Sequence, residues 1–133
     1  MAHEANDLAE TIKAMRPMVP ARDFHTSQRF YVDIGFRPQL LTDRLAEMWC
    51  GTYSFFLQDY YVKDWADNFV MHMLVTDVER WWKHISSLDL PGRYGTKARA
   101  PHAESWGMVA GFTDPSGVLW RLTEFGARDA AEG

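Results

Sequence analysis

With 133 residues, the chain is long enough for one domain with a real hydrophobic core, or for two small halves that share one. Hydrophobic residues make up 47% and charged residues 24%, which excludes overall disorder, and a formal net charge of -4 argues against a nucleic-acid partner. The single cysteine, Cys50, cannot form an internal disulfide, and neither a secretory leader nor a membrane-length apolar run is evident, so we expect a cytoplasmic protein with no membrane partner.

The first half of the chain predicts a strand and a helix followed by three strands. Pro17 and Pro20 exclude a helix interior, which favours an edge or first strand. Asp23 or Thr26 can cap the helix that follows, and Gly35 is a typical C-terminal stop. In chain order we expect an N-terminal arm or short helix over 1–15, a strand over 16–22, a helix over 26–34, and strands over 36–41, 45–50 and 52–59.

The second half repeats this order after a polar connector with interleaved aromatics over 60–68. Asp77 can cap the second helix, and the Leu-Pro-Gly run at 90–92 is predicted to stop it. The Asp-Pro-Ser-Gly turn at 114–117 predicts a hairpin between the last two strands. We expect a strand over 69–76, a helix over 78–88, strands over about 93–101, 108–113 and 118–124, and a flexible tail over 126–133.

The last strand has two different sides. Val118, Trp120 and Leu122 alternate with Leu119, Arg121 and Thr123, so one side should pack on a core while the other presents Arg121. A strand of this kind can line a ligand site, although from this stretch alone an ordinary half-buried hairpin is the favoured interpretation.

The repeated order predicts an α+β fold of two βαβββ modules. The modules cover about 16–60 and 68–125 of a single domain over 16–125. Neither module could bury its sheet alone, so we expect the sheets to join edge to edge and to curve around a shared cleft with the helices outside.

The chain resembles the vicinal oxygen chelate superfamily, which holds glyoxalase I, bleomycin-resistance proteins, extradiol dioxygenases and fosfomycin-resistance enzymes. The resemblance covers about 16–125 and looks nearest to the bleomycin-resistance members, from the Ala-Arg-Asp-Phe run at 21–24 and the Ser-Trp-Gly turn at 105–107. The residues that carry it are Asp23, Ser27, Phe30, Tyr31, Gly35 and Phe36 within 19–36, the stretch 67–82, and the stretches 105–107 and 112–117.

The resemblance also implies where a metal ion would bind in the metal-using members. Those positions fall on Arg16, Val70 and Arg121 here, and the fourth-strand stretch 55–58 offers no carboxylate. Arginine stays protonated and carries only donors, so it does not ligate a cation. A register error of two residues would put His72, instead of Val70, at the ligand position of the fifth strand. The other two positions would still hold arginines, so only one residue could bind a metal ion. We therefore expect no metal and no other cofactor.

Arg16 and Arg121 are predicted to lie near one another in the cleft. Two guanidinium groups there would favour an anion or a planar acceptor. The alternative is that both are neutralised within the chain by Glu47, Asp59 or Glu124, since buried charges are normally paired.

Three tryptophans and one histidine complete the predicted ligand site. Trp49, Trp106 and Trp120 are the aromatic residues expected to line the cleft, and Trp106 resembles the drug-stacking residue of bleomycin-resistance proteins. His72 shares a strand face with Val70 and is either a ligand-binding group or a structural histidine. The predicted ligand-binding residues are Arg16, Trp49, His72, Trp106, Trp120 and Arg121, and no catalytic residue is assigned.

Three functions remain open from the sequence. The first is a metal-free protein that binds a small molecule, an antibiotic or another planar or anionic ligand, in a cleft of a homodimer and so confers antibiotic resistance. The second is a lyase, isomerase or dioxygenase with a displaced metal site, or with acid–base chemistry through His72 or Glu124. The third is a partner-binding module in which the cleft is vestigial and the aromatic connector makes protein contacts.

Overall fold

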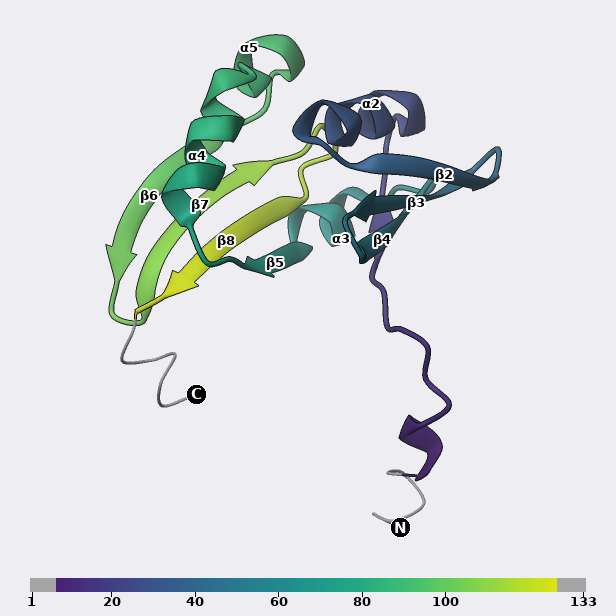
Figure 1. Ribbon diagram of the computed structural model, residues 1–133. Coiled ribbons are helices and arrows are strands. Elements are labelled where there is room, and N and C mark those ends of the chain that lie inside the picture. The colour runs from purple at the N-terminus through teal and green to yellow at the C-terminus, as the bar shows by residue number, and fades with distance from the viewer. Residues whose placement is uncertain (1–6, 127–133) are drawn as a thin grey trace.

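The computed structural model describes residues 7–126; the predictions for residues 1–6 and for the tail beyond 126 lie outside that range. The protein consists of two four-stranded mixed sheets with helices packed on them (Figure 1). The elements of the first half are β1 (Met18–Pro20), α2 (Phe24–Ile34), β2 (Arg37–Thr42), β3 (Leu45–Cys50) and β4 (Tyr53–Gln58). Those of the second half are α3 (Lys63–Asp67), β5 (Val70–Leu74), α4 (Val78–Ser87), α5 (Leu90–Tyr94), β6 (Ala98–Glu104), β7 (Gly107–Thr113) and β8 (Leu119–Phe125).

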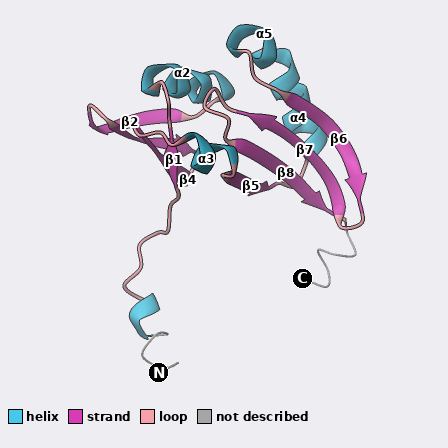
Figure 2. Cartoon of the chain, turned by 180° about the vertical axis from the view of Figure 1, so that it is seen from behind, coloured by secondary structure: helices cyan, strands magenta, loops and turns pink. Residues whose placement is uncertain are grey.

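The two halves have the same topology, which confirms the predicted βαβββ repeat. The strand order is β1-β4-β3-β2 in the first sheet and β5-β8-β7-β6 in the second, and in each the first strand runs parallel to the last. Each main helix begins at a predicted aspartate: Asp23 accepts a bond from the Thr26 amide at 3.1 Å and Asp77 one from the Arg80 amide at 3.0 Å. In Figure 2, α2 lies over the first sheet and α4 over the second.

The predicted strand over 93–101 is wrong at its start. Residues 90–94 form the short helix α5, and β6 begins only at Ala98. Proline suits the first turn of a helix because its missing N–H has no partner there, and the Asp89 side chain accepts a bond from the Gly92 amide. The Leu-Pro-Gly run therefore starts a second helix where a stop was expected. The connector likewise contains a short helix, α3.

The expectation that the sheets join edge to edge is also wrong. Within residues 7–126 the strands form two separate sheets, with no strand pair between them. A shared core unites the halves instead: Tyr31 and Phe36 of the first half pack their rings on Trp120 of the second. The indole of Trp120 also stacks on Phe112, with the ring planes at 8°.

A buried hydrogen-bond network reinforces this junction. The Tyr31 hydroxyl donates to Asp114 at 2.6 Å and accepts from the Trp120 indole N–H at 2.9 Å. The other oxygen of Asp114 accepts the amide N–H groups of Ser116 and Val118, so the carboxyl also holds the turn before β8. Burial raises the pKa of the Asp114 carboxyl, although the Tyr31 hydroxyl and these amides act in the opposite direction. The Asp-Pro-Ser-Gly turn thus connects β7 to β8, and its Asp114 carboxyl also links the two halves through the Tyr31 hydroxyl.

The raised pKa of Asp114 predicts a specific pH dependence of stability. Because the folded state holds this proton more tightly than the unfolded chain, the stabilisation is complete below the ordinary aspartate pKa and is lost as the pH rises through the raised value. Asp114→Asn removes the titration. The wild-type protein should therefore be most stable relative to this variant in acid, and the difference in free energy of unfolding should shrink with rising pH in urea titrations. A difference that grows with pH would contradict this assignment.

The segment before β1 leaves the body of the protein as an arm (Figure 1). Leu8, Ile12 and Met15 are all exposed there, Met15 by 86%, so residues 7–15 do not bury their apolar side chains on their own chain. In residues 7–126, no helix is both long and apolar enough to span a bilayer.

Candidate functional site

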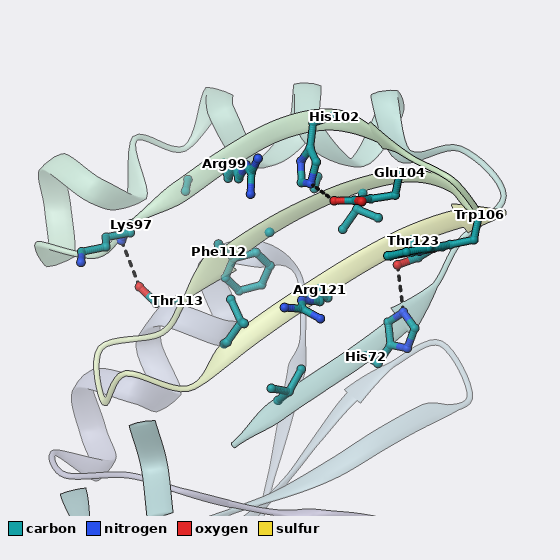
Figure 3. A pocket seen from close by; sticks show the side chains of 16 residues that line it. His72, Lys97, Arg99, His102, Glu104, Trp106, Phe112, Thr113, Arg121 and Thr123 are labelled. Atoms are coloured by element: carbon teal, nitrogen blue, oxygen red, sulfur yellow. Dashed lines mark hydrogen bonds and ion pairs between the residues drawn. The ribbon is translucent and has the colours of Figure 1, made fainter. Parts of the chain in front are cut away.

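A hollow of about 790 Å³ lies on the face of the second sheet opposite α4 (Figure 3). We call it the second-sheet hollow. Its lining comes from all four strands of that sheet, from the residue before β6 and from the turn between β6 and β7. The lining residues are Val70, His72, Lys97, Ala98, Arg99, His102, Glu104, Trp106, Val109, Ala110, Gly111, Phe112, Thr113, Leu119, Arg121 and Thr123.

Strand register determines which side chains meet in the hollow. Directly opposite residues of paired strands point to the same face of a sheet. Arg121 of β8 lies opposite His72 of β5 and Gly111 of β7, and Gly111 in turn lies opposite Arg99 of β6. These four residues, which we call the middle row, therefore form one line across the sheet.

Two histidines of the hollow are held by neighbouring side chains. His72 lies 2.8 Å from the Thr123 hydroxyl through its Nε2 atom. His102 contacts Glu104 at 3.1 Å through Nε2, while its Nδ1 atom is buried without a hydrogen-bond partner in the described chain. Both rings are therefore oriented by residues of the hollow itself.

The hollow carries a positive charge although the whole chain is negative. Lys97, Arg99 and Arg121 line it, and none of them forms an ion pair within the described part of the chain. Glu104 is the one carboxylate among its lining residues, and it is turned toward His102. An anion placed in the hollow would face three cations and one partnered carboxylate.

Three of the six predicted ligand residues meet in this hollow. His72, Trp106 and Arg121 all line it, and Figure 3 shows them on β5, on the β6–β7 turn and on β8. Trp106 is 45% exposed, so its ring is open to a ligand.

Arg16 and Trp49 lie on the first sheet and do not line the hollow. Arg16 is ion-paired with Glu47 at 2.8 Å, hydrogen-bonds Ser54 and lies over the Trp49 ring at 5.2 Å. The Trp49 indole donates to Gln39 at 3.1 Å. Of the two alternatives for Arg16, the geometry thus supports internal neutralisation, and Arg16 and Arg121 do not share one site.

Trp120 is a core residue, contrary to its assignment as a ligand residue. Its side chain is only 3% exposed and packs between the halves. Since Trp120 is adjacent to Arg121 in an extended strand, the two side chains point to opposite faces of the sheet. The alternation of side chains along β8 is by itself enough to show that Trp120 and Arg121 cannot line the same face.

The sequence interpretation missed Lys97, Arg99, His102 and Glu104. These residues follow α5 or belong to β6, whose start was placed too early. The turn at 105–107 signals the pairing of His102 with Val109, but a register shift between Arg99 and His102 displaces the pairing by one residue, so the turn alone would have placed Ala100 opposite Gly111.

The residues of this chain do not fit the divalent metal ion of the metal-using superfamily members. No group of three His, Cys, Asp or Glu side chains lies close enough to hold an ion among residues 7–126. Of the positions to which the resemblance assigns ligands, Arg16 is bound to Glu47, Val70 is apolar and Arg121 is a cation. His72 enters the hollow, but its neighbour in the row is Arg121. The Glu124 carboxylate instead accepts a hydrogen bond from the Val78 amide N–H, at the start of α4, at 2.9 Å.

Comparison with known proteins supports the fold. No family model matches the chain, and no curated protein matches it. Among solved structures, a bleomycin-binding protein complexed with bleomycin has a TM-score of 0.73 at 21% identity, with 86% of this chain and 100% of that chain covered. The bleomycin-binding protein from bleomycin-producing Streptomyces verticillus, complexed with copper(II)-bleomycin, has a TM-score of 0.72 at 20% identity, over 86% and 99% of the two chains.

A more distant likeness extends to a metal-containing structure. The fosfomycin resistance protein of Listeria monocytogenes, complexed with Mn(II) and sulfate, has a TM-score of 0.67 at 10% identity, over 91% of this chain and 97% of that one. The TM-scores are thus higher for the two bleomycin-binding proteins. The chain thus has the same paired βαβββ fold as these bleomycin-binding proteins and the fosfomycin resistance protein.

Proposed function

We propose that the protein is a metal-free small-molecule-binding protein that captures a planar ligand, an antibiotic or a similar compound, in the second-sheet hollow. The observation that carries this proposal is the hollow itself, whose lining combines an exposed tryptophan, apolar side chains and three cations that form no ion pair within residues 7–126. An apolar floor with a few polar groups at its rim is typical of ligand sites, and an aromatic ring adds a stacking surface.

The solved structures that share the fold support this choice. Two of them hold bleomycin or its copper(II) complex. In the present chain the positive lining suits an anionic or neutral planar ligand better than a cationic one, so the ligand need not be bleomycin.

We further propose that residues 16–125 act as one binding domain and that two copies form a homodimer that closes the hollow. Val70, Leu74 and Phe125 are 47%, 60% and 40% exposed on β5 and β8. Exposed apolar side chains around a hollow are typical of surfaces that a partner or a ligand covers. A second copy would bury them and narrow the opening.

Trp106→Ala is expected to abolish or severely weaken ligand binding without unfolding the protein. The ring is 45% exposed at the end of the hollow, so its loss should change the free energy of unfolding by no more than about 1 kcal/mol. A thermal-shift screen of flat aromatic acids, their neutral amides and peptide antibiotics would identify ligands, and calorimetry would compare the variant with the wild type.

Trp65→Ala is the matched control, because Trp65 is 65% exposed on α3 and does not line the hollow. It should leave binding unchanged. Elemental analysis should find no stoichiometric metal after dialysis against Zn, Ni, Mn or Fe and desalting. Unchanged affinity in Trp106→Ala, or one tightly held ion per subunit, would refute the proposed function.

A further inference from the structure

The middle row has an unusual composition. Arg99 and Arg121 stand on either side of Gly111, which has no side chain to fill the space between them. Neighbouring strands lie about 4.8 Å apart, so the two arginine Cα atoms are separated by roughly 10 Å, and their guanidinium groups can approach a group held above Gly111 from both sides. In Figure 3 both side chains enter the hollow, from β6 and from β8.

The repeat supplies an internal comparison for this row. Met18 and His72 stand at matching positions before the helix caps Asp23 and Asp77, so the rows that contain them correspond. In the first sheet the row runs Met18, Phe56, Glu47 and Gln39, and in the second it runs His72, Arg121, Gly111 and Arg99.

Gly111 therefore occupies the position that Glu47 has in the first sheet. Glu47 is only 8% exposed, and its carboxylate neutralises Arg16 at 2.8 Å. In the second sheet the corresponding carboxylate is missing, while Arg99 and Arg121 have neither an ion pair nor a side-chain hydrogen bond to any residue that the structure describes.

From this we infer that the ligand is a planar aromatic acid whose carboxylate or equivalent oxyanion sits above Gly111 between Arg99 and Arg121. The inference rests on the proposed function and specifies its ligand class. A guanidinium fork matches a carboxylate with two parallel hydrogen bonds, so two forks can hold one acid group from opposite sides. Trp106, at the end of the same hollow, provides the surface for the aromatic part.

Calorimetric titration with two probes of equal shape tests the inference. Naphthalene-2-carboxylate carries the acid, and naphthalene-2-carboxamide replaces it with a neutral group. Hydrogen bonds to charged groups are strong enough that we expect the wild type to bind the carboxylate roughly 10-fold more tightly than the amide, and less so as salt is added. Arg121→Gln and Arg99→Gln should each reduce this preference while leaving affinity for the amide nearly unchanged.

Arg80→Gln is the control, since Arg80 is an exposed arginine on α4, on the other side of the sheet. It should keep the full preference. Because all three arginines are exposed, each variant should fold, which circular dichroism would verify.

Each remaining outcome overturns a different statement. Equal affinity of the wild type for the two probes, with binding still dependent on Trp106, would overturn the acid specificity and leave the proposed function standing. If both Arg121→Gln and Arg99→Gln kept the preference for the carboxylate over the amide, the proposed position of the carboxylate above Gly111 would be wrong. Binding of neither probe would overturn the inferred ligand class and leave the proposed function to the thermal-shift screen, which tests it separately.

Discussion

Trp120→Ala is expected to lower the free energy of unfolding by about 3–5 kcal/mol, the usual cost of truncating a large buried aromatic side chain. Trp120 is 3% exposed and packs on Tyr31, Phe36 and Phe112 across the junction of the two halves. Truncation would leave a cavity there and would also remove the indole N–H that donates to the Tyr31 hydroxyl. Urea unfolding followed by circular dichroism would measure the loss.

Trp106→Ala is the comparison variant for this measurement. The two tryptophans were assigned the same role from the sequence, yet one is in the core and the other is 45% exposed at the hollow. If Trp120→Ala were as stable as Trp106→Ala, the position of Trp120 in the shared core would be wrong.

Asp114→Ala is expected to destabilise the protein by about 3 kcal/mol, because it removes the acceptor for several buried donors at once. The Tyr31 hydroxyl and the amides of Ser116 and Val118 all donate to this carboxyl. Asp114 is only 2% exposed, so water would reach these donors poorly after truncation. Equilibrium unfolding in urea at neutral pH is the measurement.

Two variants separate the contributions of this network. Asp114→Asn keeps the shape and one acceptor oxygen, so it should cost less than Asp114→Ala. Tyr31→Phe removes only the hydroxyl and should cost about 1–2 kcal/mol. A loss in Asp114→Ala no greater than that in Tyr31→Phe would mean that the amides of the turn do not depend on the carboxyl.

The repeated order of elements was predictable because each element carries its own local signal. The caps at Asp23 and Asp77, the stop at Gly35 and the turn residues that bound β3 need no knowledge of the rest of the chain. β3 has the predicted bounds, and most other strands differ by one or two residues. The βαβββ repeat follows from these local signals alone.

Local signals failed where a residue suits two structures. A proline after a leucine can end one helix or begin the next, and here the Asp89 cap makes it begin α5. The predicted strand over 93–101 ended before His102 and Glu104, which belong to the hollow, and it contained Arg99 without indicating which face of the sheet Arg99 occupies.

By itself the sequence determined the repeated βαβββ order of the elements, the residue types at the positions named by the resemblance, and the side of β8 that presents Arg121. These depend on residue type, spacing and alternation, which are properties of short stretches. Only the tertiary structure decided that Arg16 is neutralised by Glu47, that Trp120 joins the two halves, and that Arg99 and Arg121 flank Gly111. Those outcomes depend on which strands pair and in which register, and pairing is a free-energy balance over residues far apart in the chain.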